Sequence, residues 1–515
     1  MPLRFAILDV ESALPHSSSP LLQPRHDVLT VGTAARRAGH EVEVYVEVLN
    51  GLPGERLAEY DVVGAAVQGP NYSTTKRFFE RVRKENPRAV LLAGGPYASV
   101  GPNDVLKIAD IVVREEADET IVELLAALEA GAPLDDIAGI SFNRNGGVVH
   151  NPRRPFLKQP GIIHDLDLLV GFKRLSLPMQ ILRKGGIYSG QAATSRGCPF
   201  PCTFCYENML GGTGFRSCGV EPFIEDMRRK IEFFGTRDFS LADSNFGTNP
   251  KHCREYLRAI IDADLRCKFT ALCRVDIGRY PDILELMSEA GFIRLSLGME
   301  ALEEPTLASI QKRQSVEQIV ESIAAIRSFG IDVYGLFMIG FDSDSERTSE
   351  AMTRFCKDND VSALSIFCLT EYPGLPGRTI PRYRICETNL DYSGAHFVNT
   401  FPKQIRPSVL ERAVYDALLK FYSPGAVLAS LFGNHGGLAF QLGLYRQWRK
   451  IARISEVHQR ELEQIEAPYY DSNDRLREDY LRAHPVLTAP LEENLMADWS
   501  DPVEPEEPQV VSIGA

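Results

Sequence analysis

The sequence predicts an α/β protein in which two parallel-sheet domains are followed by a mostly helical region. Apolar strand-like runs alternate with amphipathic helix-like runs over residues 1–130, and the same alternation returns over 191–372. Strand-like runs then cease, and helical periodicity dominates 400–470. The length of 515 residues is enough for about two to four domains.

The first unit is predicted to be a doubly wound, flavodoxin-like sheet. Strands are expected at 5–11, 41–48, 62–67, 89–93 and 111–114, and helices at 31–39, 73–84 and 119–130. Gly39 and Gly131 are expected to end two of these helices, and Ser73 to cap the start of another. Ligands of such sheets bind at the carboxyl ends of the strands, so the site is expected in the loops there.

The second unit is predicted to be a partial barrel of six β/α units. Strands are expected at 192–195, 238–242, 268–272, 292–297, 332–339 and 363–369, and helices at 221–234, 251–262, 280–290, 316–329 and 345–357. By analogy with complete barrels, the loops after the strands should carry the site.

Five segments are therefore expected along the chain. These are a first domain (1–135), a linker (136–185), the barrel domain (186–400), a helical region (401–486) and a disordered acidic tail (487–515). A hairpin turning at Asn145-Gly146-Gly147 is expected inside the linker. The loop 372–377 and the aromatic stretch 383–397 are candidate substrate walls, although such aromatics equally suit a core.

Three cysteines lie close together in the loop after the first barrel strand. Cys198, Cys202 and Cys205 have the spacing Cys-x-x-x-Cys-x-x-Cys, which suits three corners of an iron–sulfur cube. Three ligands leave the fourth iron open, and an open metal position is where chemistry takes place. The alternatives are redox thiols, or zinc with a distant ligand such as His252 or Cys253.

Composition narrows the class of protein. The net charge of −13 argues against nucleic acid as the main partner, and no apolar run is long enough to span a bilayer. The first residues are typical of a strand and not of a secretory signal, so a cytoplasmic protein with reduced thiols is expected. The other cysteines are then expected to be small buried side chains: Cys218, Cys253, Cys267, Cys273, Cys356, Cys368 and Cys386.

The region of about 185–375 resembles the radical S-adenosylmethionine (SAM) enzymes. The cysteine spacing matches their motif, and Phe204 matches the aromatic residue before the third cysteine. The resemblance implies a 4Fe–4S cluster on the three cysteines, with SAM on the open iron. It further implies a set of cofactor-binding residues after the strands: Phe204, Tyr206, Asp243, Asn245, Arg274 and Glu300.

The resemblance also suggests what several of these residues do. The main chain of Tyr206 would contact adenine, Glu300 the ribose or amino end of SAM, and Arg274 the carboxylate, which arginine binds bidentately. The alternative for Arg274 and Glu300 is a salt bridge within the barrel, and Lys312 weakly matches a basic position downstream. Asp243-Ser244-Asn245 stands where many relatives carry Gly-Gly-Glu, so the contact to the SAM amino group is left open.

The first domain resembles the cobalamin-binding domain that precedes this barrel in one large subgroup. The resemblance rests on strand-end segments, and it implies a set of cobalamin-binding residues: Gln68, Asn71, Tyr72, Gly94, Gly95 and Pro96. The alternative is a flavodoxin-like domain that binds a nucleotide or nothing. The Asp-x-His-x-x-Gly motif is missing, since residues 9–16 do not fit it, so no protein histidine is expected beneath the cobalt. Residues 70–73 are the expected floor, and His40 is expected to be structural.

Together the resemblances imply a cobalamin-dependent radical SAM methyltransferase. Such an enzyme would methylate an unactivated carbon of a small molecule or natural product, through a 5′-deoxyadenosyl radical and methylcobalamin, with flavodoxin or ferredoxin as electron donor. The first alternative keeps the cofactors but performs cyclisation, ring contraction or coupling. The second is a cobalamin or SAM sensor without turnover.

Overall fold

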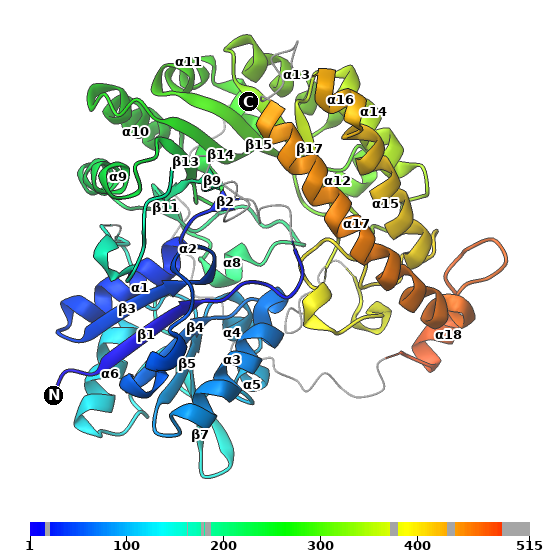
Figure 1. The fold of residues 1–515 in the computed structure, drawn as a ribbon. Coiled ribbons are helices and arrows are strands. Elements are labelled where there is room, and N and C mark those ends of the chain that lie inside the picture. Colours follow the sequence, from blue (N-terminus) through cyan, green and yellow to red (C-terminus); the bar gives the residue numbers. More distant parts are fainter. Residues whose placement is uncertain are drawn as a thin grey trace.

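The computed structural model describes residues 1–15, 21–161, 163–176, 180, 187–370, 380–429 and 438–486. The predicted acidic tail and the loop 372–377 lie outside these residues. Two sheet-containing bodies lie one above the other, and the C-terminal helices run along one side of the molecule (Figure 1). In the described parts, no helix is both long and apolar enough to cross a membrane.

The first sheet has the strand order β3-β1-β4-β5-β6-β7-β8. Its parallel strands are β1 (Arg4–Asp9), β3 (Glu41–Val46), β4 (Val62–Ala66), β5 (Val90–Gly94) and β6 (Ile111–Val113). This is the flavodoxin-like order, in which the direction of winding reverses between β1 and β4. The predicted doubly wound fold is therefore confirmed.

Helices cover both faces of this sheet because its strands alternate large side chains between the faces. Phe5 and Ile7 of β1 pack with α1 (His26–Arg37) and α6 (Thr120–Ala130). Ala6 and Leu8 belong to the opposite core, under α3 (Tyr72–Glu85) and α4 (Pro96–Val100). The helices flank the sheet in Figure 1, with α5 (Pro102–Val105) beside α4.

The hairpin expected in the linker belongs to the first sheet. Strands β7 (Ile140–Arg144) and β8 (Gly147–His150) pair antiparallel, and β7 pairs with β6. Asn145 and Gly146 both have positive φ, 50° and 82°, as a two-residue type I′ turn requires. The sheet thus extends beyond residue 135, because the buried Ile140 and Phe142 complete the core under α6.

The second sheet contains six parallel strands in chain order, as predicted. They are β10 (Gly190–Ala192), β13 (Asp238–Leu241), β14 (Lys268–Arg274), β15 (Phe292–Glu300), β16 (Asp332–Ile339) and β17 (Ala363–Cys368). The intervening helices are α9 (Val220–Phe234), α10 (Pro250–Asp262), α11 (Pro281–Ala290), α12 (Glu304–Ser309), α13 (Val316–Ser328) and α14 (Thr348–Asp358).

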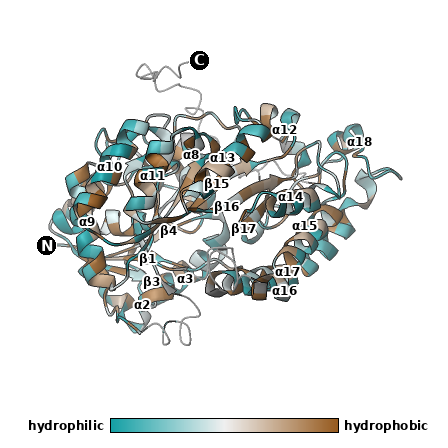
Figure 2. Ribbon diagram, turned by 90° about the horizontal axis from the view of Figure 1, so that it is seen from above, coloured by the Kyte–Doolittle hydropathy of each residue, from teal (hydrophilic) through white to brown (hydrophobic). Residues whose placement is uncertain are grey.

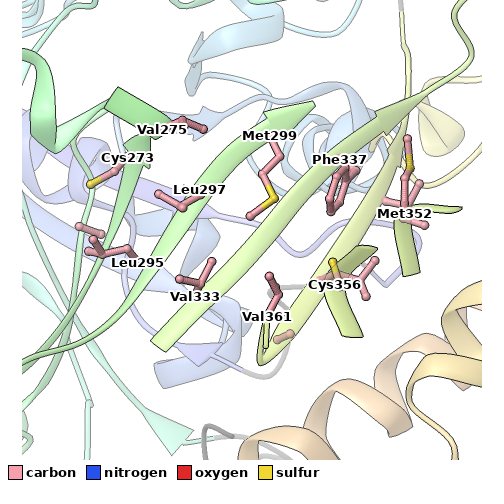
Figure 3. Close-up of a cluster of buried hydrophobic side chains, with 14 of the residues drawn as sticks. Cys273, Val275, Leu295, Leu297, Met299, Val333, Phe337, Met352, Cys356 and Val361 are labelled. Atoms are coloured by element: carbon pink, nitrogen blue, oxygen red, sulfur yellow. The ribbon is translucent and has the colours of Figure 1, made fainter. Parts of the chain in front are cut away.

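One face of the barrel sheet packs on these helices. Figure 3 shows Leu297 and Met299 of β15 gathered with Phe337 of β16, and Met352 and Cys356 of α14 close the same cluster. The central strands are largely hydrophobic in Figure 2, whereas the outer helices carry both hydrophilic and hydrophobic residues. The opposite face of these strands is thereby left for the interior of the barrel.

The C-terminal helices cover the free edge of β17. These are α15 (Pro407–Phe421), α16 (Pro424–Ala429), α17 (Leu438–Glu466) and α18 (Glu478–Ala483). The Tyr422 hydroxyl accepts from the Leu364 amide and donates to the Leu364 carbonyl, both at 2.8 Å. The Cys368 amide donates to the carbonyl of Ala395. Covering an edge strand in this way satisfies its backbone and prevents further pairing.

Several short elements complete the fold. They are α2 (Glu47–Asn50), α8 (Glu207–Leu210), the paired strands β2 (Leu21–Leu22) and β9 (Ile187–Tyr188), and the antiparallel pair β11 (Ser195–Arg196) and β12 (Arg216–Ser217).

A buried polar cluster joins the two bodies. Asp226 of α9 accepts from the His164 ring at 3.0 Å and pairs with Lys230 at 2.6 Å. The other ring nitrogen of His164 bonds the Thr30 hydroxyl of α1. The side chains of these three residues, His164, Asp226 and Lys230, are each at most 2% exposed. Burial and the nearby Lys230 ammonium lower the pKa of His164 to about 4.

We expect stability to fall as the pH drops from about 6.5 to 4. In this window the unfolded chain protonates His164 while the folded chain keeps it neutral, so protons favour unfolding. The loss from this one residue should amount to about 3 kcal/mol. Urea unfolding at several pH values checks this, because the His164→Gln variant should show a flatter pH dependence; equal slopes would refute the assignment.

Candidate active site

The three cysteines lie in a loop, residues 197–215, that is closed by the antiparallel pair β11 and β12. The Cys198 amide donates to the Gly212 carbonyl, which folds the loop back on itself. Gly197 has φ of +83°, and a Cβ there would lie 2.1 Å from the Gly214 carbonyl oxygen. Glycine is therefore required at this position for the loop to close.

The loop brings the three thiols close enough for the charge on one to influence the others. Cys202 is buried, and Cys198 and Cys205 are half-buried. Burial raises the pKa of Cys205 to about 12, with a contribution from the other two thiols, and burial also raises the pKa of Cys198. Burial therefore favours the protonated form of Cys198 and Cys205; bound iron would supply positive charge and stabilise the thiolates.

The donor chemistry suits an iron–sulfur cluster. In the described chain no three His, Cys, Asp or Glu side chains converge on a single metal ion. A cube does not need such convergence, since each thiolate binds a different iron. Arg274 adds a positive charge, with its Nη1 3.8 Å from the Cys202 sulfur.

Arg274 is held at the end of β14 by three contacts. Its guanidinium lies 4.0 Å from the centre of the Phe200 ring, and its Nη2 donates to the Lys312 carbonyl at 2.5 Å. Its backbone amide donates to Asn245 Oδ1 at 3.0 Å. The carboxylate contact expected for Arg274 stays a prediction, and the structure places its side chain against the cysteine loop.

Asp243 and Asn245, predicted after the second barrel strand, face different partners. Asp243 accepts from the Thr194 amide, the Thr194 hydroxyl and the Ser195 hydroxyl, so it braces the entry to the cysteine loop. Asn245 is also buried, but its Nδ2 has no hydrogen-bond partner among the described residues. A buried amide donor left free in this way is suited to a bound ligand.

Glu300 and Lys312 form a buried ion pair at 2.6 Å, with side chains 9% and 7% exposed. Glu300 has φ of +63°, in the left-handed region. A Cβ on Gly298 would lie 2.6 Å from Glu300 Oε1 and 2.8 Å from Lys312 Nζ, so glycine leaves room for the pair. The salt bridge considered as the alternative for Glu300 is present, and its contact to SAM stays a prediction.

One aromatic residue of the motif, Phe204, lies beside this pair. Phe204 is half-buried, and the Lys312 ammonium lies 5.9 Å from the centre of its ring. Tyr206 is the residue before α8, and its carbonyl accepts from the Leu210 amide. The structure thus places all of the residues predicted for the cluster and SAM at the carboxyl ends of β10 to β15.

In the first domain, Asn71 lies at the point where the winding of the sheet reverses. Its Nδ2 donates to the carbonyls of Val10, after β1, and Ala66, at the end of β4. Its Oδ1 accepts from the Gln68 amide at 2.7 Å. Asn71 is 2% exposed, so it fixes the crevice between the two strands from within.

The other predicted cobalamin residues follow β4 or lie at the end of β5. The Tyr72 hydroxyl donates to the Asp104 carbonyl, and its ring packs edge-on against Tyr97. Gly94, Gly95 and Pro96 are half-buried at the end of β5. Gly95 has φ of +97°, and a Cβ there would lie 3.0 Å from the Val67 carbonyl oxygen. Glycine therefore lets the backbone turn sharply from β5 into α4 while it packs against the backbone of Val67.

Two family models match this chain. Residues 27–125 match the B12 binding domain, and residues 193–356 match the radical SAM superfamily. The chain belongs to the cobalamin-dependent radical SAM enzymes. The cofactors of this enzyme are accordingly a 4Fe–4S cluster, SAM and cobalamin.

Two curated relatives and one solved structure are similar to this chain. An uncharacterized methyltransferase of Pyrococcus horikoshii is 27% identical over 360 residues, which is 68% of this chain and 76% of the relative. An anaerobic magnesium-protoporphyrin IX monomethyl ester cyclase of Synechocystis is 26% identical, covering 66% of this chain and 68% of the relative. The radical SAM methyltransferase TsrM of Kitasatospora setae has the same fold, with a TM-score of 0.63, 17% identity, and coverage of 88% of this chain and 100% of TsrM.

In this radical SAM enzyme, sequence reasoning missed two side chains at the point where the winding of the first sheet reverses, where cobalamin is predicted to bind. Arg25, just before α1, pairs with Asp9 at the end of β1 at 2.9 Å. Arg25 also donates to the Ala66 carbonyl, which Asn71 shares. No motif marks either residue; the available signal was an acidic residue at the end of the first strand.

Replacing Asn71 with alanine should lower the free energy of unfolding by about 3 kcal/mol, because two buried carbonyls lose their donor. It should also reduce cobalamin retention, since the crevice loses its brace. Asn86→Ala is the matched control: Asn86 likewise donates to two carbonyls, of Leu57 and Tyr60, but outside the crevice. Equal cobalamin retention in both variants, measured by absorbance after gel filtration, would contradict this role.

Proposed function

We propose that the enzyme transfers a methyl group from SAM, by way of cobalamin, to an unactivated carbon of a small molecule. When bound, the cofactors supply one-electron cleavage of one SAM to methionine and a 5′-deoxyadenosyl radical, and they supply a methyl group that comes from a second SAM and is carried on cobalt. We propose Cys198, Cys202 and Cys205 as the cluster ligands. Methyltransferases among the relatives support the reaction class.

One observation carries the proposal: loops at the carboxyl ends of both sheets meet. Asp118, after β6, pairs with Arg196 beside the cysteine loop at 2.9 Å. The Ser73 hydroxyl, beside the cobalamin crevice, donates to Asp391 at 2.6 Å, in the segment after β17. A reaction that uses two cofactors on one carbon needs both held on the same side of the substrate cleft.

The residues of this chain bind and shield the cofactors. The buried pair of Glu300 and Lys312, with Arg274, is positioned to orient SAM and to exclude water beside the cluster. Asn71 and the 70–73 loop would support cobalamin, and the substrate would enter between the two sheets. The electron would come from a cytoplasmic donor such as flavodoxin or ferredoxin, and all ten cysteines are free, as a reducing compartment requires.

Isotope tracing tests the proposal. The anaerobically reconstituted enzyme, a reductant and SAM with a deuterated methyl group should yield labelled methylcobalamin and, with the right substrate, a labelled product. Mass spectrometry reads both. If SAM is cleaved to 5′-deoxyadenosine and neither cobalamin nor any product carries the label, the proposed methyl transfer is wrong.

The second candidate keeps the cofactors but closes a ring without methyl transfer, and the Synechocystis cyclase among the relatives favours it. The same tracing separates the two, because a cyclase product would carry no label. A protein that only senses SAM or cobalamin would form no 5′-deoxyadenosine.

A further inference from the structure

The cysteine loop has a stem that carries two like charges opposite each other. Arg196 of β11 and Arg216 of β12 are direct partners in the antiparallel ladder. Like charges in this position destabilise a strand pair unless something neutralises them. Both side chains are largely buried, at 20% and 12% exposure, so water screens the repulsion poorly.

The neutralising charges come from the other domain. Arg196 reaches the two oxygens of Asp118 at 2.9 and 3.0 Å. Arg216 reaches both oxygens of Glu116 at 2.8 Å, and Arg196 approaches the same carboxylate at 3.3 Å. Two carboxylates thus balance two guanidinium groups, and all four are mostly buried. Such bidentate, shared pairs are the geometry in which ion pairs contribute most.

The two acidic residues are themselves tied to the cobalamin crevice. They follow β6 in a loop that begins at Glu115, which has φ of +60°. The Glu115 amide donates to the Ser99 hydroxyl, and that hydroxyl donates to the Gly95 carbonyl. A continuous set of contacts therefore runs from the turn after β5 to the stem of the cysteine loop.

Building on the proposed function, we propose that Glu116, Asp118, Arg196 and Arg216 act as positioning residues, which fix the cluster relative to cobalamin. We assign these four residues no contact with the reacting atoms or with either cofactor. Their effect is to make the geometry of the cysteine loop depend on the docked first domain. Loss of the carboxylates should leave each cofactor bound but widen the range of distances between them.

Pulsed EPR on the holoenzyme tests this. The dipolar coupling between cob(II)alamin and the reduced cluster should give one narrow distance distribution in the wild type. In Glu116→Gln/Asp118→Asn the distribution should be at least about twofold wider, with iron and cobalamin contents unchanged. Asp118→Glu, which keeps the charge, should restore most of the wild-type width. An unaltered distribution in the doubly neutralised variant would overturn the proposal.

The matched control is Asp282→Asn, which breaks a pair with Arg254 at 2.6 Å between two helices of the barrel domain alone. It should leave the distribution unchanged.

A second measurement needs no cofactor. Hydrogen exchange of amides in 195–217 of the cofactor-free full chain should be about tenfold faster in the neutralised variant than in Asp282→Asn. Equal rates would also overturn the proposal. A wild type that fails to bind cobalamin or the cluster would instead refute the proposed function, and the exchange experiment would still decide the role of the network.

Discussion

Replacement of Cys202 by alanine should abolish the iron–sulfur cluster and lower SAM cleavage by more than about a hundredfold. Loss of an outer contact to a metal ligand already costs about 10- to 100-fold, and Cys202 is proposed as a ligand itself. It is also the buried member of the three, at 7% exposure, so water cannot easily replace its sulfur. Iron, acid-labile sulfide and 5′-deoxyadenosine are the quantities to measure after anaerobic reconstitution.

Cys267→Ala provides the control, because it deletes the same atom from a similarly buried cysteine just before β14. That variant should lose about 1 kcal/mol of stability and retain the cluster. Iron and turnover that persist in Cys202→Ala would exclude the cysteine loop as the metal site.

Glu300→Gln should have the second largest effect, on stability and on SAM together. The change leaves the Lys312 ammonium buried without its counter-charge, and breaking a buried pair in this way costs about 3 to 5 kcal/mol. SAM cleavage should also fall, since the proposed contact to SAM is lost. Urea unfolding and the rate of 5′-deoxyadenosine formation measure the two effects.

The double variant Glu300→Gln/Lys312→Met separates them. Removing the second charge should recover most of the stability, because no unpaired ion remains. It should not recover SAM cleavage. If cleavage returns with stability, the pair serves the fold alone, as the salt-bridge alternative for Glu300 supposes.

Most strands of both sheets were predictable from sequence because buried parallel strands form continuous apolar runs. The first barrel strand was expected at 192–195 but is Gly190–Ala192. The ends of the helices were predicted less accurately. The first was expected at 31–39 but begins at His26, because Val28 and Leu29 already pack on the sheet. Ser73 does not cap α3; the helix begins at Tyr72, and the Ser73 hydroxyl reaches Asp391 instead. Tertiary contacts of this kind leave no local signal.

The candidate site was predictable where its residues are local in sequence. The cysteines lie on one loop, and the strand ends of a parallel sheet meet at one edge by construction. The role of Asn71 was not predictable, because it depends on two strand ends that only the strand order brings together. The pairing of Asp118 with Arg196 was not predictable either, because it depends on how the two domains dock.

Co-retention of both cofactors tests the central claim, that one chain holds a SAM-cleaving cluster beside cobalamin. The wild-type chain, reconstituted anaerobically with iron, sulfide and hydroxocobalamin, should leave gel filtration with about four irons and about one cobalamin per chain. Reduction in the presence of SAM should then yield 5′-deoxyadenosine. A chain that elutes without iron, or from which cobalamin separates completely, would contradict the account.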